Sequence, residues 1–291
     1  MNVGMRDIQL RLRKVRNVAP ILIRTLMLLI ASCLLTEGAC FGGLLPCTGQ
    51  VIQHPSGQVA PIGDIPGWHQ IFVEDFNTDV AVGSFLGAAY KDKFTVYADG
   101  VKDTAGQKGA PSRYYPSKVV SVSGGLLNLY LHTENGTPMS AALLPILPGN
   151  NLYGKYTIRF RSDALAGFKT AWLLWPNSEN WPHDGEIDFP EGSLDGTMSG
   201  FVHHQNAEVG TDQDINSTSV TYTAWHTASI EWSPNKVRFI VDDKLIGTSI
   251  TQVPNTLMHW VIQTEACTPT CPDVTTAGNL QIDWVTAYSP A

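Results

Sequence analysis

From Trp68 to the end of the chain, the sequence consists mainly of short runs in which apolar and polar residues alternate. In the segment Tyr156-Thr-Ile-Arg-Phe-Arg, the apolar residues fall on one side of an extended chain and the polar residues on the other. Clusters of Gly, Pro, Asn and Asp separate such runs, which is typical of antiparallel strands joined by turns. No stretch with the 3.6-residue period of a helix follows residue 40.

The alternating runs predict strands at residues 118–122, 126–132, 153–162, 171–175, 198–203, 225–232, 237–241, 260–264 and 280–288. The segment Val241-Asp-Asp-Lys-Leu-Ile-Gly predicts a hairpin with Asp-Asp-Lys at its tip. The 26 glycines and 18 prolines among 291 residues agree with many turns. We therefore predict one all-β domain over residues 67–291, a sandwich of two antiparallel sheets.

The first 40 residues follow a different pattern. Basic residues precede an apolar run from Ile21 to Leu35, which predicts a secretory signal peptide over residues 1–40. The run is shorter than the roughly 20 residues that span a bilayer, so a permanent membrane helix is the weaker interpretation. Ile-Ala-Ser-Cys33 also resembles a bacterial lipobox, which makes Cys33 a candidate lipid anchor. Residues 41–66 contain turn residues without periodicity and predict a linker.

The cysteines agree with export. Cys267 and Cys271 flank Thr-Pro-Thr and predict a local disulfide in an oxidising compartment. If Cys33 carries a lipid, Cys40 and Cys47 remain as a second candidate pair. We therefore expect a secreted or extracellular protein, attached to the cell surface if Cys33 is modified.

Charge narrows the class of partner. Residues 1–40 contain six basic and two acidic side chains, which leaves 13 basic and 24 acidic side chains, of totals of 19 and 26, for residues 41–291. A domain this acidic repels nucleic acid and anionic lipid, and favours a neutral or cationic substrate. We expect a monomer, and the sequence indicates no organic cofactor.

Three carboxylates lie close together in the segment Trp181-Pro-His-Asp-Gly-Glu-Ile-Asp-Phe-Pro-Glu-Gly. On a strand, Glu186 and Asp188 share a face, whereas Glu191 falls on the opposite one. One inserted residue, a β-bulge, would return Glu191 to the first face. Pro190 supports a bulge, because proline cannot donate a hydrogen bond to a regular ladder.

Such a row has three interpretations. Neighbouring carboxylates raise one another's pKa values, and glycoside hydrolysis needs one ionised carboxylate and one protonated carboxylic acid. The same acids could instead form a solvated face or a Ca²⁺ site. Tryptophans near the segment favour a glycan site, because an indole packs against the apolar face of a sugar. Trp172, Trp175 and Trp181 are the candidates for substrate contact, whereas Trp232 and Trp260 are expected in the core.

At these residues the sequence resembles glycoside hydrolase family 16, the laminarinase and lichenase group. Glu186-Ile-Asp-Phe-Pro-Glu191 matches the longer, bulged form of that family's motif. The resemblance extends over most of the domain, and the matching segments are Phe72-Val-Glu-Asp-Phe-Asn, Tyr153-Gly-Lys-Tyr-Thr-Ile-Arg-Phe-Arg, Trp225-His-Thr-Ala-Ser-Ile-Glu-Trp, the Val241-Asp-Asp hairpin and Ile282-Asp-Trp-Val-Thr-Ala-Tyr. Phe189-Pro190 departs from the more usual aliphatic pair, and His183-Asp184 from the usual residues before the motif.

The resemblance implies a β-jelly-roll with a concave substrate cleft and retaining hydrolysis of internal β-glycosidic bonds. It implies that Glu186 is the nucleophile, Asp188 its assistant and Glu191 the general acid/base. His203, in Gly-Phe-Val-His, matches a histidine near the acid/base. A structural Ca²⁺, which family members often bind on the convex side, would have Asp75 and Asp283 as candidate ligands.

The predicted function is a secreted endo-β-1,3-glucanase, or a mixed-linkage β-1,3-1,4 variant, that acts on a neutral polysaccharide. Two alternatives remain open. The same chemistry could act on a galactan or another cell-wall or host glycan, because the family includes agarases, carrageenases and transglycosylases. The fold could also serve as a non-catalytic glycan-binding module, although such a module has no need for three carboxylates that repel one another.

Overall fold

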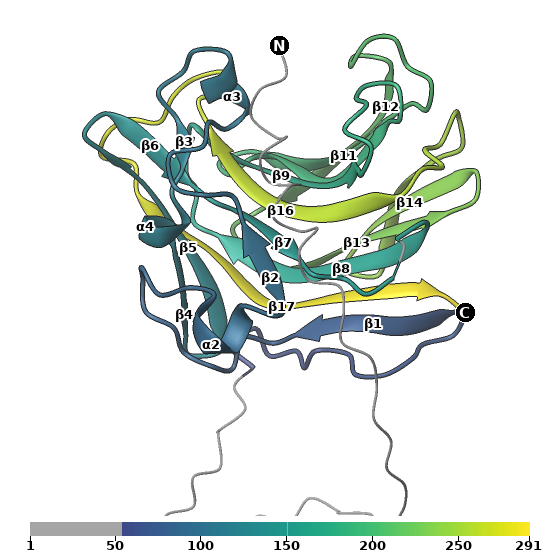
Figure 1. The fold of residues 1–291 in the computed structure, drawn as a ribbon, viewed down its shortest axis with the longest axis horizontal. Helices are drawn as coiled ribbons and strands as arrows, with labels where there is room; N and C mark the ends of the chain where they lie inside the picture. Colours follow the sequence, from purple (N-terminus) through teal and green to yellow (C-terminus); the bar gives the residue numbers. More distant parts are fainter. Residues whose placement is uncertain (1–53, 150) are drawn as a thin grey trace, which may run out of the picture. The chain divides into compact units, whose positions relative to one another are not determined.

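The computed structural model describes residues 54–149 and 151–291, which belong to one compact unit (Figure 1). The predicted signal peptide, the candidate lipid anchor at Cys33 and the possible Cys40–Cys47 pair lie outside these residues. Within the described part of the chain, no helix is long and apolar enough to cross a bilayer. The helices it contains are single turns: α2 (Gly87–Tyr90), α3 (Thr104–Gln107) and α4 (Pro116–Val119).

The described residues form a jelly-roll sandwich of two sheets. One sheet has ten strands: β1 (Trp68–Glu74), β3 (Arg113–Tyr114), β4 (Val120–Ser123), β5 (Leu126–Glu134), β6 (Thr137–Ser140), β8 (Gly154–Ser162), β13 (His226–Ser233), β14 (Lys236–Val241), β15 (Lys244–Ser249) and β17 (Gly278–Pro290). Its main path is β15-β14-β13-β8-β17-β5-β6-β3, with β1 paired to β17 and β4 paired to β5. The β3–β6 pair is parallel, and the others are antiparallel.

The second sheet has seven strands in the order β12-β11-β10-β9-β16-β7-β2. Their bounds are β2 (Phe94–Val96), β7 (Ala142–Pro145), β9 (Phe168–Pro176), β10 (Glu186–Ser193), β11 (Thr197–His203), β12 (Gln213–Thr221) and β16 (Met258–Ala266). In Figure 1 strands β9 and β16 curve upward at their ends, so the face of this sheet that points away from the ten-stranded sheet is concave. We call it the site face.

Each predicted strand overlaps an observed one, so the antiparallel sandwich is confirmed. One segment differs: Pro116–Val119 forms α4, and strand β4 begins only at Val120. Strand β12 (Gln213–Thr221) and the short strands β2, β3, β6 and β7 were not predicted. Strand β12 lies at an edge of its sheet and is mostly polar on both faces. The predicted hairpin is present, with Asp242 and Asp243 both at positive φ in a two-residue turn.

The core lies between the two sheets and is rich in aromatic rings. Trp232 and Trp260 are buried there, as predicted. Trp260 packs edge-on against Tyr156, with ring centroids 5.5 Å apart. Burial of apolar side chains contributes about 25 cal/mol per Å² of area removed from water, so these large rings stabilise the sandwich strongly.

The described part of the predicted linker, residues 54–66, is not a free connector. The backbone N–H of Ser56 donates to Asp283 Oδ2 at 3.2 Å, and Arg159 Nη2 donates to the carbonyl oxygen of Ser56 at 3.3 Å. Ala60 is buried. Sequence periodicity missed this segment because its backbone bonds to side chains of the ten-stranded sheet and forms no regular strand.

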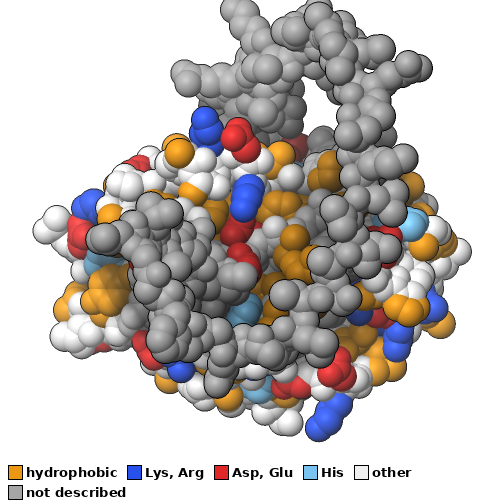
Figure 2. All heavy atoms as spheres, turned by 90° about the horizontal axis from the view of Figure 1, so that it is seen from below, with side chains coloured by type: hydrophobic (Ala, Val, Ile, Leu, Met, Phe, Trp, Pro, Cys, Tyr) orange, Lys and Arg blue, Asp and Glu red, His pale blue; other side chains and the backbone are white. Residues whose placement is uncertain are grey.

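The predicted local disulfide between Cys267 and Cys271 is present. It closes the loop that follows β16, where the N–H of Cys267 donates to the carbonyl oxygen of Gly167, the residue before β9. On the face of the molecule shown in Figure 2, basic and acidic side chains lie among hydrophobic ones wherever grey atoms do not cover the surface.

Candidate active site

Strand β10 carries all three carboxylates of the acidic motif on the site face. Strand β10 pairs with the neighbouring strand β11, where His203 lies opposite Glu186, Phe201 opposite Asp188 and Ser199 opposite Glu191. The register shifts between Asp188 and Glu191 against both neighbouring strands. The predicted bulge is therefore present, and it returns Glu191 to the face of the other two acids.

The bulge fits because the core accepts its extra residue. Phe189 points between the sheets and packs against Phe239, with ring centroids 5.0 Å apart. On β11, Gly200 lies opposite the bulge, and a Cβ atom there would be 2.7 Å from the Phe239 ring. Glycine at this position therefore leaves the space that the two phenylalanines occupy.

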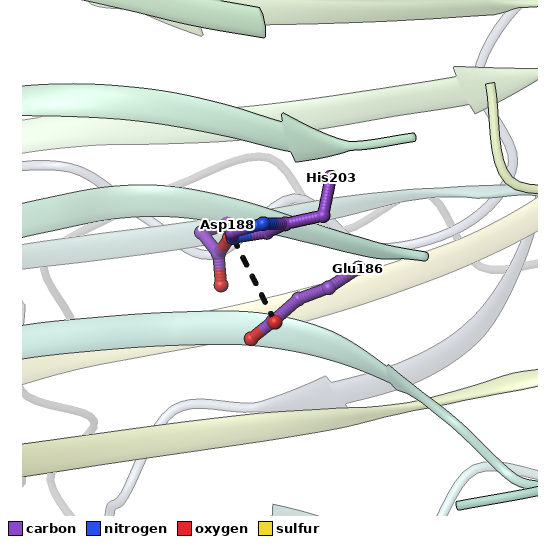
Figure 3. Close-up of side chains that lie close together, drawn as sticks. All are labelled: Glu186, Asp188 and His203. Carbon is purple, nitrogen blue, oxygen red and sulfur yellow. Dashed lines mark ion pairs between the residues drawn. The ribbon is translucent and has the colours of Figure 1, made fainter. Parts of the chain in front are cut away.

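Glu186, Asp188 and His203 converge from two neighbouring strands, as Figure 3 shows. His203 Nε2 lies 3.4 Å from Asp188 Oδ2 and 3.8 Å from Glu186 Oε2. Glu186 is 8% exposed and Asp188 only 1% exposed. Water therefore reaches the first carboxyl slightly and the second hardly at all.

The tautomer of His203 follows from its other ring nitrogen. Nδ1 lies 2.8 Å from the carbonyl oxygen of Gly210, which can only accept, so Nδ1 carries a hydrogen. Nε2 then faces Asp188 Oδ2, a buried atom with no hydrogen-bond partner. His203 and Asp188 therefore lie within ion-pair distance but form no hydrogen bond with each other.

Burial governs the electrostatics of this pair of acids. It raises the pKa of Glu186 well above its usual value, the charge of Asp188 raises it further, and the charge of His203 opposes the rise. Burial likewise raises the pKa of Asp188, with an added contribution from the charge of Glu191. Such strongly perturbed carboxyls, arranged side by side, are typical of catalytic sites.

Glu191 is more exposed and has a different partner. Lys169 Nζ, from strand β9, lies 2.5 Å from Glu191 Oε1 and 3.8 Å from Glu265 Oε2. The two glutamates predicted to act as nucleophile and acid/base therefore differ in surroundings, because one is buried beside carboxyl and imidazole groups and the other is paired with an ammonium group.

Two of the three predicted substrate tryptophans lie near the acids. Trp175 and Trp181 stack with ring centroids 6.1 Å apart, and Trp181 also contacts His203 edge-on at 5.9 Å. Trp181 is 40% exposed. Trp175 is partly buried and donates from Nε1 to Glu179 Oε2 at 3.1 Å. Trp181 is therefore the more available surface for a sugar ring.

The prediction for Trp172 was wrong. Its side chain is fully buried between the sheets and packs edge-on against Phe160 at 4.7 Å. On strand β9 the residues that face the acids are Lys169, Ala171, Leu173 and Trp175, whereas Trp172 has the opposite parity. Trp172 cannot contact substrate from this position.

The family model described as Glycosyl hydrolases family 16 matches residues 106–286, which is more than half of the chain and includes the whole acidic motif. The chain belongs to glycoside hydrolase family 16. The family resemblance found in the sequence is thereby confirmed, and with it the jelly-roll fold.

Comparison with individual members agrees with the family. A glucan endo-1,3-beta-glucosidase from Cryptopygus antarcticus is 31% identical over 114 residues, which is 35% of this chain and 42% of that protein. The chain spans only 36–44% of the length of the curated relatives it matches. The laminarinase structure from Rhodothermus marinus has a TM-score of 0.63 at 21% identity, covering 77% of this chain and 98% of that one.

A third comparison concerns another kind of substrate. A structure from a study of endo-acting O-glycanases of the human gut microbiota, which initiate mucin breakdown, also has a TM-score of 0.63. It is 19% identical and covers 79% of this chain and 94% of that one. The laminarinase and the structure from the O-glycanase study are thus equally similar in fold to this chain.

The residues predicted to bind calcium in this family 16 chain lie outside the site face. Asp283 is buried, accepts the N–H of Ser56 and lies near Arg159; burial raises its pKa. Calcium binding at Asp75 and Asp283 stays a prediction.

Two residues that contact the candidate site were not predicted from the sequence, Lys169 and Gly210. Lys169 could not be found from the chain, because its place beside Glu191 depends on the register of β9 against β10. Gly210 gave no signal. Its carbonyl oxygen fixes His203, and a Cβ atom there would lie 2.2 Å from the Trp181 indole, so the loop holds both residues in place.

We predict that Trp181→Ala raises KM for an oligosaccharide about tenfold, equivalent to the loss of ~1.4 kcal/mol of binding, with a smaller change in kcat. The physical reason is the loss of a half-exposed indole beside the acids. Steady-state kinetics on oligosaccharides would measure the effect. Trp225→Ala is the matched control, because Trp225 packs under Arg161 on the other sheet, 4.9 Å from its guanidinium carbon. Equal KM changes in both variants would refute the assignment.

Proposed function

We propose that this protein is a secreted, endo-acting β-glucanase that hydrolyses internal β-1,3 or mixed β-1,3-1,4 bonds with retention of configuration. The observation that carries the proposal is the row of Glu186, Asp188 and Glu191, which a bulge keeps on one concave face within the region matched by the family model. Secretion rests on the N-terminal sequence pattern.

In the proposed mechanism Glu186 attacks the anomeric carbon while Glu191 protonates the departing glycosidic oxygen. The covalent glycosyl-enzyme is then hydrolysed by water, which Glu191 deprotonates as general base. Glu186 must be ionised for this attack, and the neighbouring charge of His203 favours its ionised form against the effect of burial. Its burial desolvates the nucleophile and keeps competing water away from it.

The choice of a neutral β-glucan rests on charge, aromatic surface and relatives. The acidic domain disfavours polyanions. Trp181 offers an apolar face for a sugar ring beside the acids. Proteins named beta-glucanase and glucan endo-1,3-beta-glucosidase are among the relatives.

Another glycan is the second candidate substrate. The equal TM-scores for a laminarinase and for the O-glycanase study show that fold similarity does not separate β-glucans from host glycans. A purely glycan-binding role is less favoured. Holding Glu186 and Asp188 together in a buried site costs stability, and binding a neutral sugar does not require it.

The full-length protein should be incubated with laminarin, lichenan, agarose, xyloglucan and mucin, and the products separated by chromatography. We expect a ladder of oligosaccharides from laminarin or lichenan early in the reaction, with retained anomeric configuration by NMR. If only agarose or mucin gave products, the proposed substrate would be wrong and the proposed mechanism would still hold. Binding without products from any polymer would refute the hydrolase.

A further inference from the structure

A lysine lies between the predicted acid/base and a second, buried glutamate. Lys169 Nζ is 2.5 Å from Glu191 Oε1 and 3.8 Å from Glu265 Oε2, and its side chain is 14% exposed. The three residues come from the adjacent strands β10, β9 and β16, so the sheet itself fixes their order. The ammonium group has little access to water and depends on these two carboxylates.

Glu265 has no part in the proposed mechanism, yet it is only 2% exposed. It accepts hydrogen bonds from the N–H of Thr104 at 3.3 Å, from the Thr104 hydroxyl, and from Gln263 Nε2 at 3.4 Å. Burying a carboxyl costs free energy that these contacts offset only partly, and burial accordingly raises the pKa of Glu265. Lys169 is its partner of opposite charge.

We propose that Lys169 and Glu265 are positioning residues that set the charge state of Glu191 during glycoside cleavage. Lys169 holds the Glu191 carboxyl in place and stabilises its ionised form. The Glu265 carboxylate also attracts the Lys169 ammonium group and so weakens the effect of that group on Glu191. The inference deepens the proposed function and rests on it.

The other charged groups around this pair are few. Asp188, on the same face of β10, is a further negative charge near Lys169. Asp103, buried at the N-cap of helix α3, is a further negative charge that acts on Glu265. Burial alone would lower the pKa of Lys169, but the carboxylates of Glu191 and Glu265 outweigh it and raise the pKa above its usual value. The lysine therefore stays cationic over the range in which glycosidases work.

The two partners should have opposite effects on catalysis. In a retaining glycosidase the alkaline limb of kcat/KM reports loss of the proton from the general acid. Without the Lys169 ammonium group, Glu191 keeps its proton to higher pH, so the alkaline limb of kcat/KM moves to higher pH. Without the Glu265 charge, the Lys169 ammonium group interacts with Glu191 alone, and one negative charge near Glu191 is removed. Both changes favour ionised Glu191, so the alkaline limb moves to lower pH.

The experiment compares kcat/KM from pH 4 to 10 for Lys169→Met and Glu265→Gln on the polysaccharide that the native protein cleaves. We expect the alkaline limb to rise by about 1 pH unit in Lys169→Met and to fall by a smaller amount in Glu265→Gln. Lys169→Arg, which keeps the cation, should restore the native limb even if kcat is lower. Lys155→Met is the matched control, because it breaks a Lys–Glu pair of 3.1 Å on the other sheet.

Shifts in the same direction, or no shift in either variant, would overturn the proposal, because a purely structural role lowers activity without moving the limb in opposite directions. A readout independent of activity separates this outcome from failure of the proposed function. The ¹³C carboxyl resonance of Glu191, assigned with Glu191→Gln, should titrate at higher pH in Lys169→Met and at lower pH in Glu265→Gln. Superimposable titration curves would refute the proposal even if no glycan is cleaved.

Discussion

Glu186→Gln is expected to lower kcat on the cleaved polysaccharide on the order of 10⁴-fold or more, because an amide cannot form the glycosyl-enzyme ester. The substitution keeps the size of the side chain and its place beside His203. Product release should be measured by reducing-end assay and chromatography. Glu231→Gln is the matched control and should keep full activity, because Glu231 is a partly buried glutamate that pairs with Lys155 on the ten-stranded sheet.

The same variant should be folded and more stable than the native protein at pH 7. Burial raises the folded-state pKa of Glu186, so its ionisation opposes folding as the pH rises. Gln cannot ionise and avoids this cost. The difference in free energy of unfolding should disappear below pH 4.5, the usual value for this group, where the native carboxyl is protonated in both states. Retained hydrolysis by the folded variant would exclude Glu186 as nucleophile.

Trp172→Ala should lower the free energy of unfolding by about 3–5 kcal/mol, the range for removing a large aromatic side chain from a core. Trp172 packs against Phe160 and lies beside the bulge on the core side of β9. Urea denaturation followed by far-UV circular dichroism would measure the loss. Activity per folded molecule should fall too, because the acids on β10 lie on the strand that the indole supports.

Trp172→Phe separates packing from hydrogen bonding. The buried Nε1 of Trp172 has no hydrogen-bond partner, so phenylalanine removes volume without breaking a bond. We expect this variant to lose much less stability than the alanine variant. If alanine cost under ~1 kcal/mol, the indole would not be packed as the structure shows, and its role on the site face would be open again.

Strand parity explains both what could be predicted for this site and what was missed. Glu186, Asp188 and Glu191 could be placed on one face because the period of two and the proline together indicated a bulge. The same parity argues against placing Trp172 and Trp175 on one face of an unbulged strand. The error at Trp172 came from grouping tryptophans by nearness in sequence.

Other features depend on register and could not be read from the chain. Lys169, Glu191 and Glu265 come from three strands whose order only the fold sets. The packing of residues 54–66 depends on buried partners such as Asp283, which lies more than 200 positions away. Sequence patterns report the face of a residue within its own strand, and they carry no information about its neighbours across the sheet.

The bulge at Phe189 and Pro190 also bears on how this motif can change during evolution. A bulge absorbs one residue, so the chain between Asp188 and Glu191 can lengthen or shorten by one without turning the acid/base into the core. That freedom holds only while the opposite strand keeps a residue as small as Gly200, where a side chain would meet Phe239. The bulged form of the motif and the glycine at position 200 are therefore coupled, because a side chain at 200 would fill the space beside Phe239 that the bulge needs.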